Sequence, residues 1–187
     1  MKEGKTVDRI KIRKGNKEIE IVIRYPKKSD LTKIWKFYNK VIKETPFLAR
    51  ITPVSRKEEE KWFRETMEGM RKKNEIYIVA EHKGKIVGSA SVTREELQTH
   101  KHAGVYGICV LQEYTGKGLG KRLSWHVLRI AKDSLNIEIV KLSVYKNNRV
   151  AQKLYKRLGF AYAGKIPGGI KRKGKYTDDI IMYKVLK

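Results

Sequence analysis

A glycine-rich stretch at residues 115–121, Thr-Gly-Lys-Gly-Leu-Gly-Lys, holds the residue types best suited to chemistry in this chain. It follows an apolar run at residues 104–110 and precedes apolar residues at helical spacing, so it is expected to join a strand to a helix. Glycines let the backbone turn tightly and approach a ligand without a Cβ in the way. The first N–H groups of a helix are unpaired, and the helix dipole favours negative charge there. The stretch therefore predicts a diphosphate site, with Lys117 and Lys121 at its rim.

The spacing of the glycines distinguishes between kinds of anion-binding turn. The dinucleotide fingerprint G-x-G-x-x-G requires glycine where this chain has Lys121. The nucleotide P-loop G-x-x-x-x-G-K-[ST] fails because the residue five after Gly116 is Lys121 and no Gly-Lys-Ser/Thr follows. The pattern is instead Gly-x-Gly-x-Gly, at Gly116, Gly118 and Gly120. Taken alone, it also fits a plain strand–helix turn with glycines for packing.

A second stretch, residues 144–160, reads VYKNNRVAQKLYKRLGF. Together the two stretches resemble the GNAT superfamily of N-acetyltransferases. The family's coenzyme-A motif, [QR]-x-x-G-x-[GA] after an apolar strand, is matched by the strand Ile108-Cys109-Val110 with Gly118 and Gly120. The family's downstream signature, N-x-x-A-x-x-L-Y-x-x-x-G-F, is matched at Asn148, Ala151, Leu154, Tyr155, Gly159 and Phe160. The resemblance covers about residues 19–187, and residues 174–182 are similar to the last strands of small-amine and phosphinothricin-type members.

The resemblance implies an α/β, three-layer α-β-α fold. Its mixed, largely antiparallel sheet would splay at the central strands to admit the pantetheine arm of acetyl-CoA. It also implies direct transfer of the acetyl group to a primary amine, with backbone N–H groups of residues 108–110 polarising the thioester carbonyl. The residues implied to bind the cofactor are Ile108, Cys109, Val110, Thr115, Gly116, Lys117, Gly118, Leu119, Gly120, Lys121, Asn148, Ala151 and Tyr155. We expect no metal site.

Tyr155 matches the family's usual general acid, which protonates the departing thiolate. A phenol of pKa about 10 is a weaker acid than a thiol of pKa about 8.5, so Tyr155 needs a lowered pKa or fast reprotonation. The alternative for Tyr155 is a packing aromatic. Asn148 is implied to contact the cofactor arm or an ordered water, and it can at the same time cap a helix. Thr115 departs from the family preference for Gln or Arg, so we expect a side-chain contact to the phosphates to be missing.

The base that accepts a proton from the amine is not singled out by the sequence. An amine of pKa near 10 is almost wholly protonated at pH 7, so some group must take that proton. Two histidines precede the central strand and titrate in the right range. These are His100 and His102. Glu44, Glu81 and Tyr106 are equally good candidates for the base. Cys109 lies in an apolar run, which favours a small core residue over a nucleophile.

Hydrophobic periodicity and turn signals predict the elements that must position these residues. A β-hairpin at 6–24, turning at 14–17, precedes a helix capped by Ser29 or Asp30 and a loop at 44–54. A capping box, Ser55-Arg56-Lys57-Glu58, starts a helix that runs to about Lys72. The remaining elements are a hairpin at 75–81 and 85–92, a loop at 93–103, strands at 104–110 and 137–144, helices at 119–135 and 148–158, and final strands at 160–165 and 179–185 separated by a loop.

Length and composition bound the remaining possibilities. The 187 residues suit a single domain, with residues 1–18 as an N-terminal extension that forms a hairpin strand. One cysteine excludes an internal disulfide, and the sequence shows neither a signal peptide nor a membrane span, so we expect a cytoplasmic monomer or homodimer. Abundant lysine with little Cys and Met also suits a thermophile. The net charge of +24 indicates either a solvated surface or contact with a polyanion such as nucleic acid.

The acceptor amine is left open among three functions. The first is acetylation of a small or amino-acid-like amine. The second is acetylation of a protein N-terminus or lysine on an acidic partner. The third is a basic nucleic-acid-binding module without activity, against which stands the even spread of basic residues. Because the chain is strongly basic, a cationic acceptor would need a local acidic pocket, for which the candidates are Glu44, Glu58–Glu60, Glu65 and Asp178–Asp179.

Overall fold

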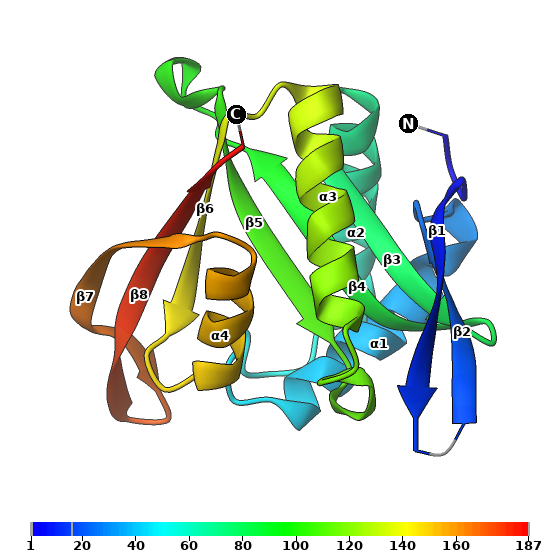
Figure 1. The fold of residues 1–187 in the computed structure, drawn as a ribbon, viewed down its shortest axis with the longest axis horizontal. Coiled ribbons are helices and arrows are strands. Elements are labelled where there is room, and N and C mark those ends of the chain that lie inside the picture. The colour runs from blue at the N-terminus through cyan, green and yellow to red at the C-terminus, as the bar shows by residue number, and fades with distance from the viewer. Residues whose placement is uncertain (1, 16, 187) are drawn as a thin grey trace.

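The computed structural model describes residues 2–15 and 17–186, which form strands and helices of one mixed fold (Figure 1). In chain order they are β1 (Thr6–Lys14), β2 (Lys17–Arg24), α1 (Leu31–Glu44), α2 (Arg56–Arg71), β3 (Glu75–His82), β4 (Lys85–Arg94), β5 (Ala103–Val110), α3 (Leu119–Leu135), β6 (Ile139–Tyr145), α4 (Arg149–Arg157), β7 (Ala161–Arg172) and β8 (Lys175–Val185). The periodicity therefore placed every helix and strand within a few residues, apart from the last two strands. The predicted turn of the first hairpin includes Asn16, which lies outside the described residues.

One sheet of eight strands, in the order β1-β2-β3-β4-β5-β6-β8-β7, forms the middle layer. All neighbours are antiparallel except β5 and β6, which run parallel. Helices α1 and α2 lie behind the sheet in Figure 1, and α3 and α4 lie in front. The predicted three-layer fold with a largely antiparallel sheet is confirmed. Among the described residues, no helix combines the length and the apolar character that crossing a membrane requires.

The central strands separate as predicted. Strands β5 and β6 pair only at Ala103–Ile139, Gly104–Val140 and Val105–Lys141. Beyond Val105, β5 continues to Val110 along β4, and β6 continues along β8, so the two strands diverge toward the lower end of the sheet in Figure 1. One edge of β5 is thereby left without a ladder partner in the described part of the chain. Such an edge offers backbone donors and acceptors to a ligand.

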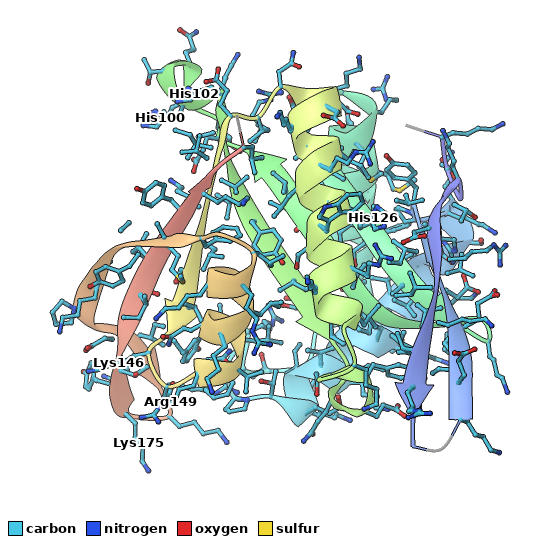
Figure 2. All side chains as sticks on the ribbon, in the orientation of Figure 1. His100, His102, His126, Lys146, Arg149 and Lys175 are labelled. Carbon is cyan, nitrogen blue, oxygen red and sulfur yellow. The ribbon has the colours of Figure 1, made fainter. Side chains whose placement is uncertain are left out.

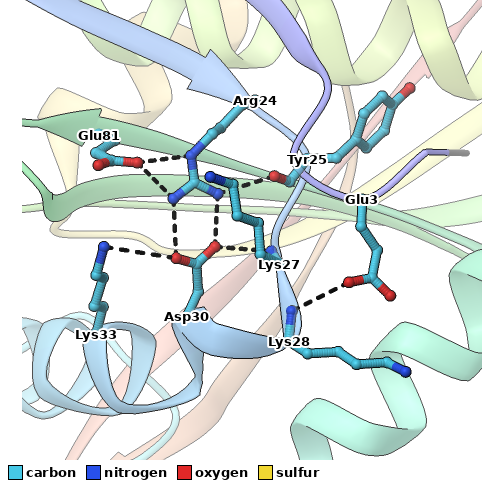
Figure 3. Close-up of polar contacts among 8 residues, drawn as sticks. All are labelled: Glu3, Arg24, Tyr25, Lys27, Lys28, Asp30, Lys33 and Glu81. Carbon is cyan, nitrogen blue, oxygen red and sulfur yellow. Dashed lines mark hydrogen bonds and ion pairs between the residues drawn. The ribbon is translucent and has the colours of Figure 1, made fainter.

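A buried ion-pair network ties β2, β3 and the start of α1 together (Figure 3). The Arg24 guanidinium donates to both carboxylate oxygens of Asp30, at 2.6 and 2.9 Å, and its Nε donates to Glu81 at 2.6 Å. Burial alone would raise the pKa of Asp30, but the hydrogen bonds from Arg24 and from the Lys27 backbone hold it below its ordinary value. Asp30 is the residue that precedes α1, as the sequence allowed, although its side chain bonds to Lys27 rather than into the helix.

The start of α2 follows the predicted capping box. The Ser55 hydroxyl accepts from the Glu58 N–H at 3.3 Å, and the Glu58 carboxylate accepts from the Ser55 N–H at 2.8 Å. The two side chains satisfy backbone donors that the helix leaves unpaired. This local arrangement places Glu59 one residue further into the helix, on its buried side.

The prediction of a loop between the last two strands was wrong. Strands β7 and β8 form a long hairpin that turns at Lys173 and Gly174, both with positive φ. The Pro-Gly-Gly run that indicated a loop lies within β7, where the pairing with β8 is irregular between Ile166 and Ile170. Proline is tolerated there because β7 is the edge strand of the sheet, where a ladder hydrogen bond can be missing without penalty.

Candidate active site

The glycine-rich turn leaves its backbone donors open at the start of α3. Gly116 and Gly118 have φ of 71° and 83°, and a Cβ added at either would meet nothing within 4 Å. These glycines are therefore required by backbone conformation, and the space beside them is empty. Gly118 is the N-cap and provides no side-chain acceptor, and the first helical bond runs from Arg122 N–H to Gly118 C=O. The N–H groups of Leu119, Gly120 and Lys121 precede that bond and make a concave, positively polarised surface.

The third glycine of the turn, Gly120, faces side chains of α4 and β5. A Cβ at Gly120 would lie 3.4 Å from the Leu154 side chain of α4 and 3.6 Å from the Ile108 side chain of β5. Both distances are ordinary van der Waals contacts, so a small side chain would also fit at this position. Leu119 beside it is fully buried in the core. Backbone conformation therefore accounts for Gly116 and Gly118, and the role of the turn as an anion site stays a prediction.

Thr115, Lys117 and Lys121 make different contacts with the rest of the turn. The Thr115 hydroxyl donates to the Gln112 carbonyl at 2.8 Å, so this side chain stabilises the preceding turn. Lys117 Nζ lies 3.3 Å from the Thr115 carbonyl. Lys121 is exposed on the first turn of α3. Where the family uses Gln or Arg, this chain thus uses a short side chain committed to its own backbone.

Residues 108–110 lie on β5 where it borders the opening. On one edge they pair with β4, as Ile108 with Ala90, Cys109 with Ser89 and Val110 with Gly88. Burial raises the pKa of the Cys109 thiol to about 12, so it stays protonated at neutral pH. That agrees with the expectation of a small core residue, because a thiol nucleophile needs a lowered pKa.

Asn148 and Ala151 form the N-cap of α4, across the opening from α3. The Ala151 N–H donates to the Asn148 side-chain oxygen at 3.1 Å. The N-cap interpretation of Asn148 therefore holds. Its side-chain NH₂ group is not used by this cap.

Tyr155 lies on the buried side of α4 with two other aromatic rings. Its ring centroid is 5.9 Å from Tyr106 in an edge-to-face contact and 5.8 Å from Phe160. Burial raises the pKa of Tyr155 to about 12, and the nearby Cys109 thiol adds to the rise. The lowered pKa considered from the sequence is not found, because the phenol is surrounded by apolar groups that disfavour the phenolate.

A cavity of about 350 Å³ lies on the opposite face of the sheet, between α1, α2 and strands β3–β5. Tyr38, Trp62 and Tyr77 line it, together with residues 107–109 of β5. One charged group in its lining, Glu59, is only 3% exposed, and its Oε1 has no hydrogen-bond partner among the described residues. Burial raises the pKa of Glu59 to about 7, against a smaller lowering by Arg56.

A second and larger hollow, about 790 Å³, is lined by Lys2, Lys5, Tyr25, Lys73, Asp133 and Ser134. It lies by the C-terminal end of α3, at the far end of the helix from the glycine turn. Its lining shares no residue with the opening between β5 and β6. The smaller cavity is therefore the one that adjoins the candidate site.

The candidate bases predicted from the sequence lie elsewhere or are already bonded. His100 and His102 lie beyond the start of β5, at the top of Figure 2, whereas the cavity meets β5 at residues 107–109. At ~3.3 Å per strand residue, that is a separation of about 15 Å or more. The three other candidates are engaged: Glu81 with Arg24, Glu44 with the Gln112 N–H at 2.8 Å, and Tyr106 with Ser124 at 2.6 Å.

The predicted acidic pocket is not assembled as a whole. Of its members, only Glu58 and Glu59 line the cavity. Glu44 bonds to Gln112, and Asp178 pairs at 3.0 Å with Lys146, which is labelled in Figure 2. In the sequence alone, Glu59 is only one acid among several. The available signal is its place beside the capping box, on the face of α2 that carries Phe63 and Thr66.

The family model described as "Acetyltransferase (GNAT) family" matches residues 35–160, about two thirds of the chain. The chain belongs to the GNAT family of acetyltransferases. The matched range contains the glycine turn, the opening between β5 and β6, and α4. This GNAT protein is therefore an acyltransferase, as predicted from its two motifs.

Individual relatives agree in sequence and in structure. The chain is 27% identical over 108 residues to the L-amino acid N-acetyltransferase AaaT of Escherichia coli, covering 58% of this chain and 67% of that protein. A GNAT-family acetyltransferase from Streptococcus pneumoniae superposes with a TM-score of 0.79 at 26% identity, covering 88% of this chain and 99% of that one. The phosphinothricin acetyltransferase Pat of Sinorhizobium meliloti, solved in complex with acetyl-CoA, has the same fold with a TM-score of 0.78 at 20% identity, covering 88% of each chain.

Acetyl-CoA is the co-substrate of this GNAT protein, and the described residues fit it. The empty space at Gly116 and Gly118 and the unpaired donors after them suit a diphosphate. The unpaired edge of β5 beyond Val105 suits an extended arm carrying amide groups, since such an arm can complete the missing ladder. When bound, acetyl-CoA supplies a thioester whose carbonyl carbon accepts the amine.

Proposed function

We propose that this chain acetylates a small primary amine, amino-acid-like molecules included, by direct transfer from acetyl-CoA. The observation that supports it best is the cavity on the α1–α2 face, whose lining includes residues 107–109 of β5, where the sheet opens. An acceptor in that cavity and a thioester along the β5 edge would meet at the same strand. The names of the relatives, an L-amino acid N-acetyltransferase and a phosphinothricin acetyltransferase, favour acceptors of this size.

In this proposal the glycine turn holds the pyrophosphate. The N–H groups of Leu119, Gly120 and Lys121 donate to phosphate oxygens, and the Lys117 and Lys121 side chains add positive charge. Gly116 and Gly118 let the backbone approach the phosphates. Thr115 acts only by stabilising the turn through its bond to Gln112. The loss of a longer side chain at this position costs one contact and leaves the backbone site intact.

The β5 edge orients the reacting carbonyl. Successive N–H groups along β5 alternate in direction, and those of residues 108–110 that point away from β4 face the opening and act as an oxyanion hole. Asn148 and Ala151 border the pantetheine arm from the α4 side. The Asn148 NH₂ group, unused by the helix cap, donates to that arm or to a water on it.

Tyr155 assists departure of the thiolate as a hydrogen-bond donor. With its pKa raised to about 12, the phenol keeps its proton in the presence of a thiolate whose conjugate acid has a pKa near 8.5. Full proton transfer would be uphill by about 5 kcal/mol. A charge-assisted hydrogen bond stabilises the sulfur without that transfer, and water supplies the proton afterwards.

The test is a pair of measurements on purified protein. Thermal denaturation with and without acetyl-CoA should show stabilisation by the co-substrate, since a ligand that binds only the folded state raises its stability. Thiol release should then be followed with a panel of small amines, amino acids and a short peptide. Release with the small molecules supports the proposal. Release only with the peptide favours a protein substrate, and no stabilisation with salt-sensitive nucleic-acid binding favours the non-catalytic alternative. The cytoplasmic location and the oligomeric state stay predictions.

A further inference from the structure

The acceptor cavity contains three charged side chains, of which two neutralise each other. Arg50 donates to the Glu58 carboxylate at 2.8 Å and to the carbonyls of Thr52 and Pro53. The other oxygen of Glu58 closes the capping box with Ser55. These bonds hold the pKa of Glu58 at about 2, first through the Ser55 backbone and then through Arg50. The Arg50 and Glu58 charges therefore offset each other at this side of the cavity.

Glu59 is the third charged side chain of the cavity, and no ion pair neutralises its carboxyl group among the described residues. It is 3% exposed, and its Oε1 has no hydrogen-bond partner in the described part of the chain. Arg56, the nearest cation on its own helix, is engaged by Glu60 at 2.9 Å and by Thr32 at 2.8 Å. A buried carboxyl oxygen without a partner is costly and rare in a folded protein, so it calls for an explanation. A ligand that donates hydrogen bonds would supply the missing partner.

We propose that Glu59 binds the ammonium group of the acceptor and takes its proton, and that among small amines the preferred acceptor has an apolar body and no carboxylate. This rests on the proposed acetyl transfer. The walls of the cavity around Glu59 are Ile34, Tyr38, Trp62 and Tyr77, which suit an apolar or aromatic body. Arg50, the one cation among the described residues of the lining, already pairs with Glu58, so a carboxylate on the acceptor would have to compete with Glu58 for it.

Protons and electron pairs balance in this transfer. One proton passes from the ammonium nitrogen to a Glu59 carboxylate oxygen and leaves the neutral amine. The nitrogen lone pair then forms the C–N bond as the C–S bond breaks, and the bonding pair leaves on sulfur. The second nitrogen proton reaches that sulfur through solvent. Glu59 returns its proton to solvent, so the net products are the amide, the free thiol and one proton.

The environment of Glu59 suits this transfer. The titratable and charged groups around it are Tyr38 on α1, Tyr77 on β3, Cys109 on β5, and Arg50, Arg56 and Glu58 on its own side of the cavity. The tyrosines and the thiol stay neutral, so burial dominates and the pKa of Glu59 lies near 7. Relative to the ordinary value of 4.5, proton uptake from an amine is about 300-fold more favourable.

Glu59→Gln is the decisive variant, and Glu60→Gln is its matched control. Glu60 is the next residue on the same helix, but it is half exposed and pairs with Arg56 outside the cavity. Glutamine keeps the size of the side chain and removes the base, and the fold should persist because a buried charge is removed. The probes are 2-phenylethylamine and isoamylamine, each compared with the amino acid that adds only a carboxylate, phenylalanine and leucine.

We expect wild type and Glu60→Gln to use the amines at least tenfold better than the amino acids, measured as kcat/KM by thiol release. In both, kcat/KM should rise with pH through about 7. Glu59→Gln should lose 100-fold or more, with no rise near pH 7. It should also lose the stabilisation by 2-phenylethylamine while keeping that by acetyl-CoA. A Glu59→Gln enzyme within threefold of wild type, amino acids used better than the amines, or no stabilisation of the wild type by 2-phenylethylamine would each overturn the proposal. Absence of any acetyl-CoA effect in the wild type would instead refute the proposed function.

Discussion

Replacing Gly118 with alanine isolates the contribution of backbone approach to acetyl-CoA binding. Gly118 has a φ of 83°, a conformation that costs an L-residue about 1–2 kcal/mol, and a Cβ there would meet nothing within 4 Å. Backbone strain is therefore the only expected loss of folding free energy in the protein without ligand. For a chain of this size, that loss corresponds to a fall in Tm of about 2–8 °C.

The effect on binding is additional to the strain. The added methyl group would fill the space in which the N–H groups of Leu119–Lys121 meet the diphosphate. Loss of one charge-assisted hydrogen bond, about 1.5–3 kcal/mol, raises the Kd for acetyl-CoA about 10- to 100-fold. At a concentration about 100 times the wild-type Kd, acetyl-CoA stabilises the wild type by about 2.7 kcal/mol. A hundredfold weaker variant would gain only about 0.4 kcal/mol.

Gly84→Ala is the control, because Gly84 also has a positive φ, 76°, and a Cβ added there would likewise meet nothing within 4 Å. It lies in the turn between β3 and β4 and borders neither the glycine turn nor the cavity. Thermal denaturation of both variants, with and without acetyl-CoA, gives the comparison. We expect both variants to lose the same amount of Tm without acetyl-CoA. Only Gly118→Ala should also lose the rise in Tm that acetyl-CoA causes. If both variants keep the full shift, close approach of the backbone at position 118 plays no part in binding.

Three further predictions follow from buried polar groups. Tyr155→Phe should lower kcat about 10- to 100-fold, which corresponds to the loss of one hydrogen bond to a charged atom. The rise in Tm caused by acetyl-CoA should stay the same. Unchanged turnover would mean that Tyr155 has only a packing role. Asp30→Ala should lower the free energy of unfolding by about 3 kcal/mol in a denaturant titration, because the buried Arg24 loses a partner. The control, Asp133→Ala, breaks an exposed pair with Arg129 and should change the free energy of unfolding little. Burial raises the pKa of Glu75 to about 7 from 4.5, so the folded state binds its proton more tightly and stability should fall by about 3 kcal/mol as the pH rises between those values. Glu75→Gln should remove that part of the fall and leave the part due to Glu59; an unchanged pH profile would show that the folded-state pKa of Glu75 is ordinary.

Much of the fold followed from short-range pattern, because the signals act over a few residues. The capping box at Ser55, the left-handed glycines before α3 and the Asn148 cap are each set by backbone geometry within one turn. The error at residues 166–178 has the opposite origin. Pro167 and the glycines after it break a regular strand, but an edge strand can accommodate them in a bulge, and the edge position depends on the order of the whole sheet.

The sequence by itself determined the family, the co-substrate and the turn expected to bind it, since those depend on residue types at fixed spacing. The tertiary structure decided which ionisable groups are available for chemistry. Glu81 and Tyr106 were candidates from the sequence and proved to be bonded to Arg24 and Ser124. Glu59 became the leading candidate because helix and sheet packing bury its carboxyl group and leave Oε1 without a partner among the described residues. Desolvation and pairing depend on side chains brought together from distant elements, and no local spacing encodes them.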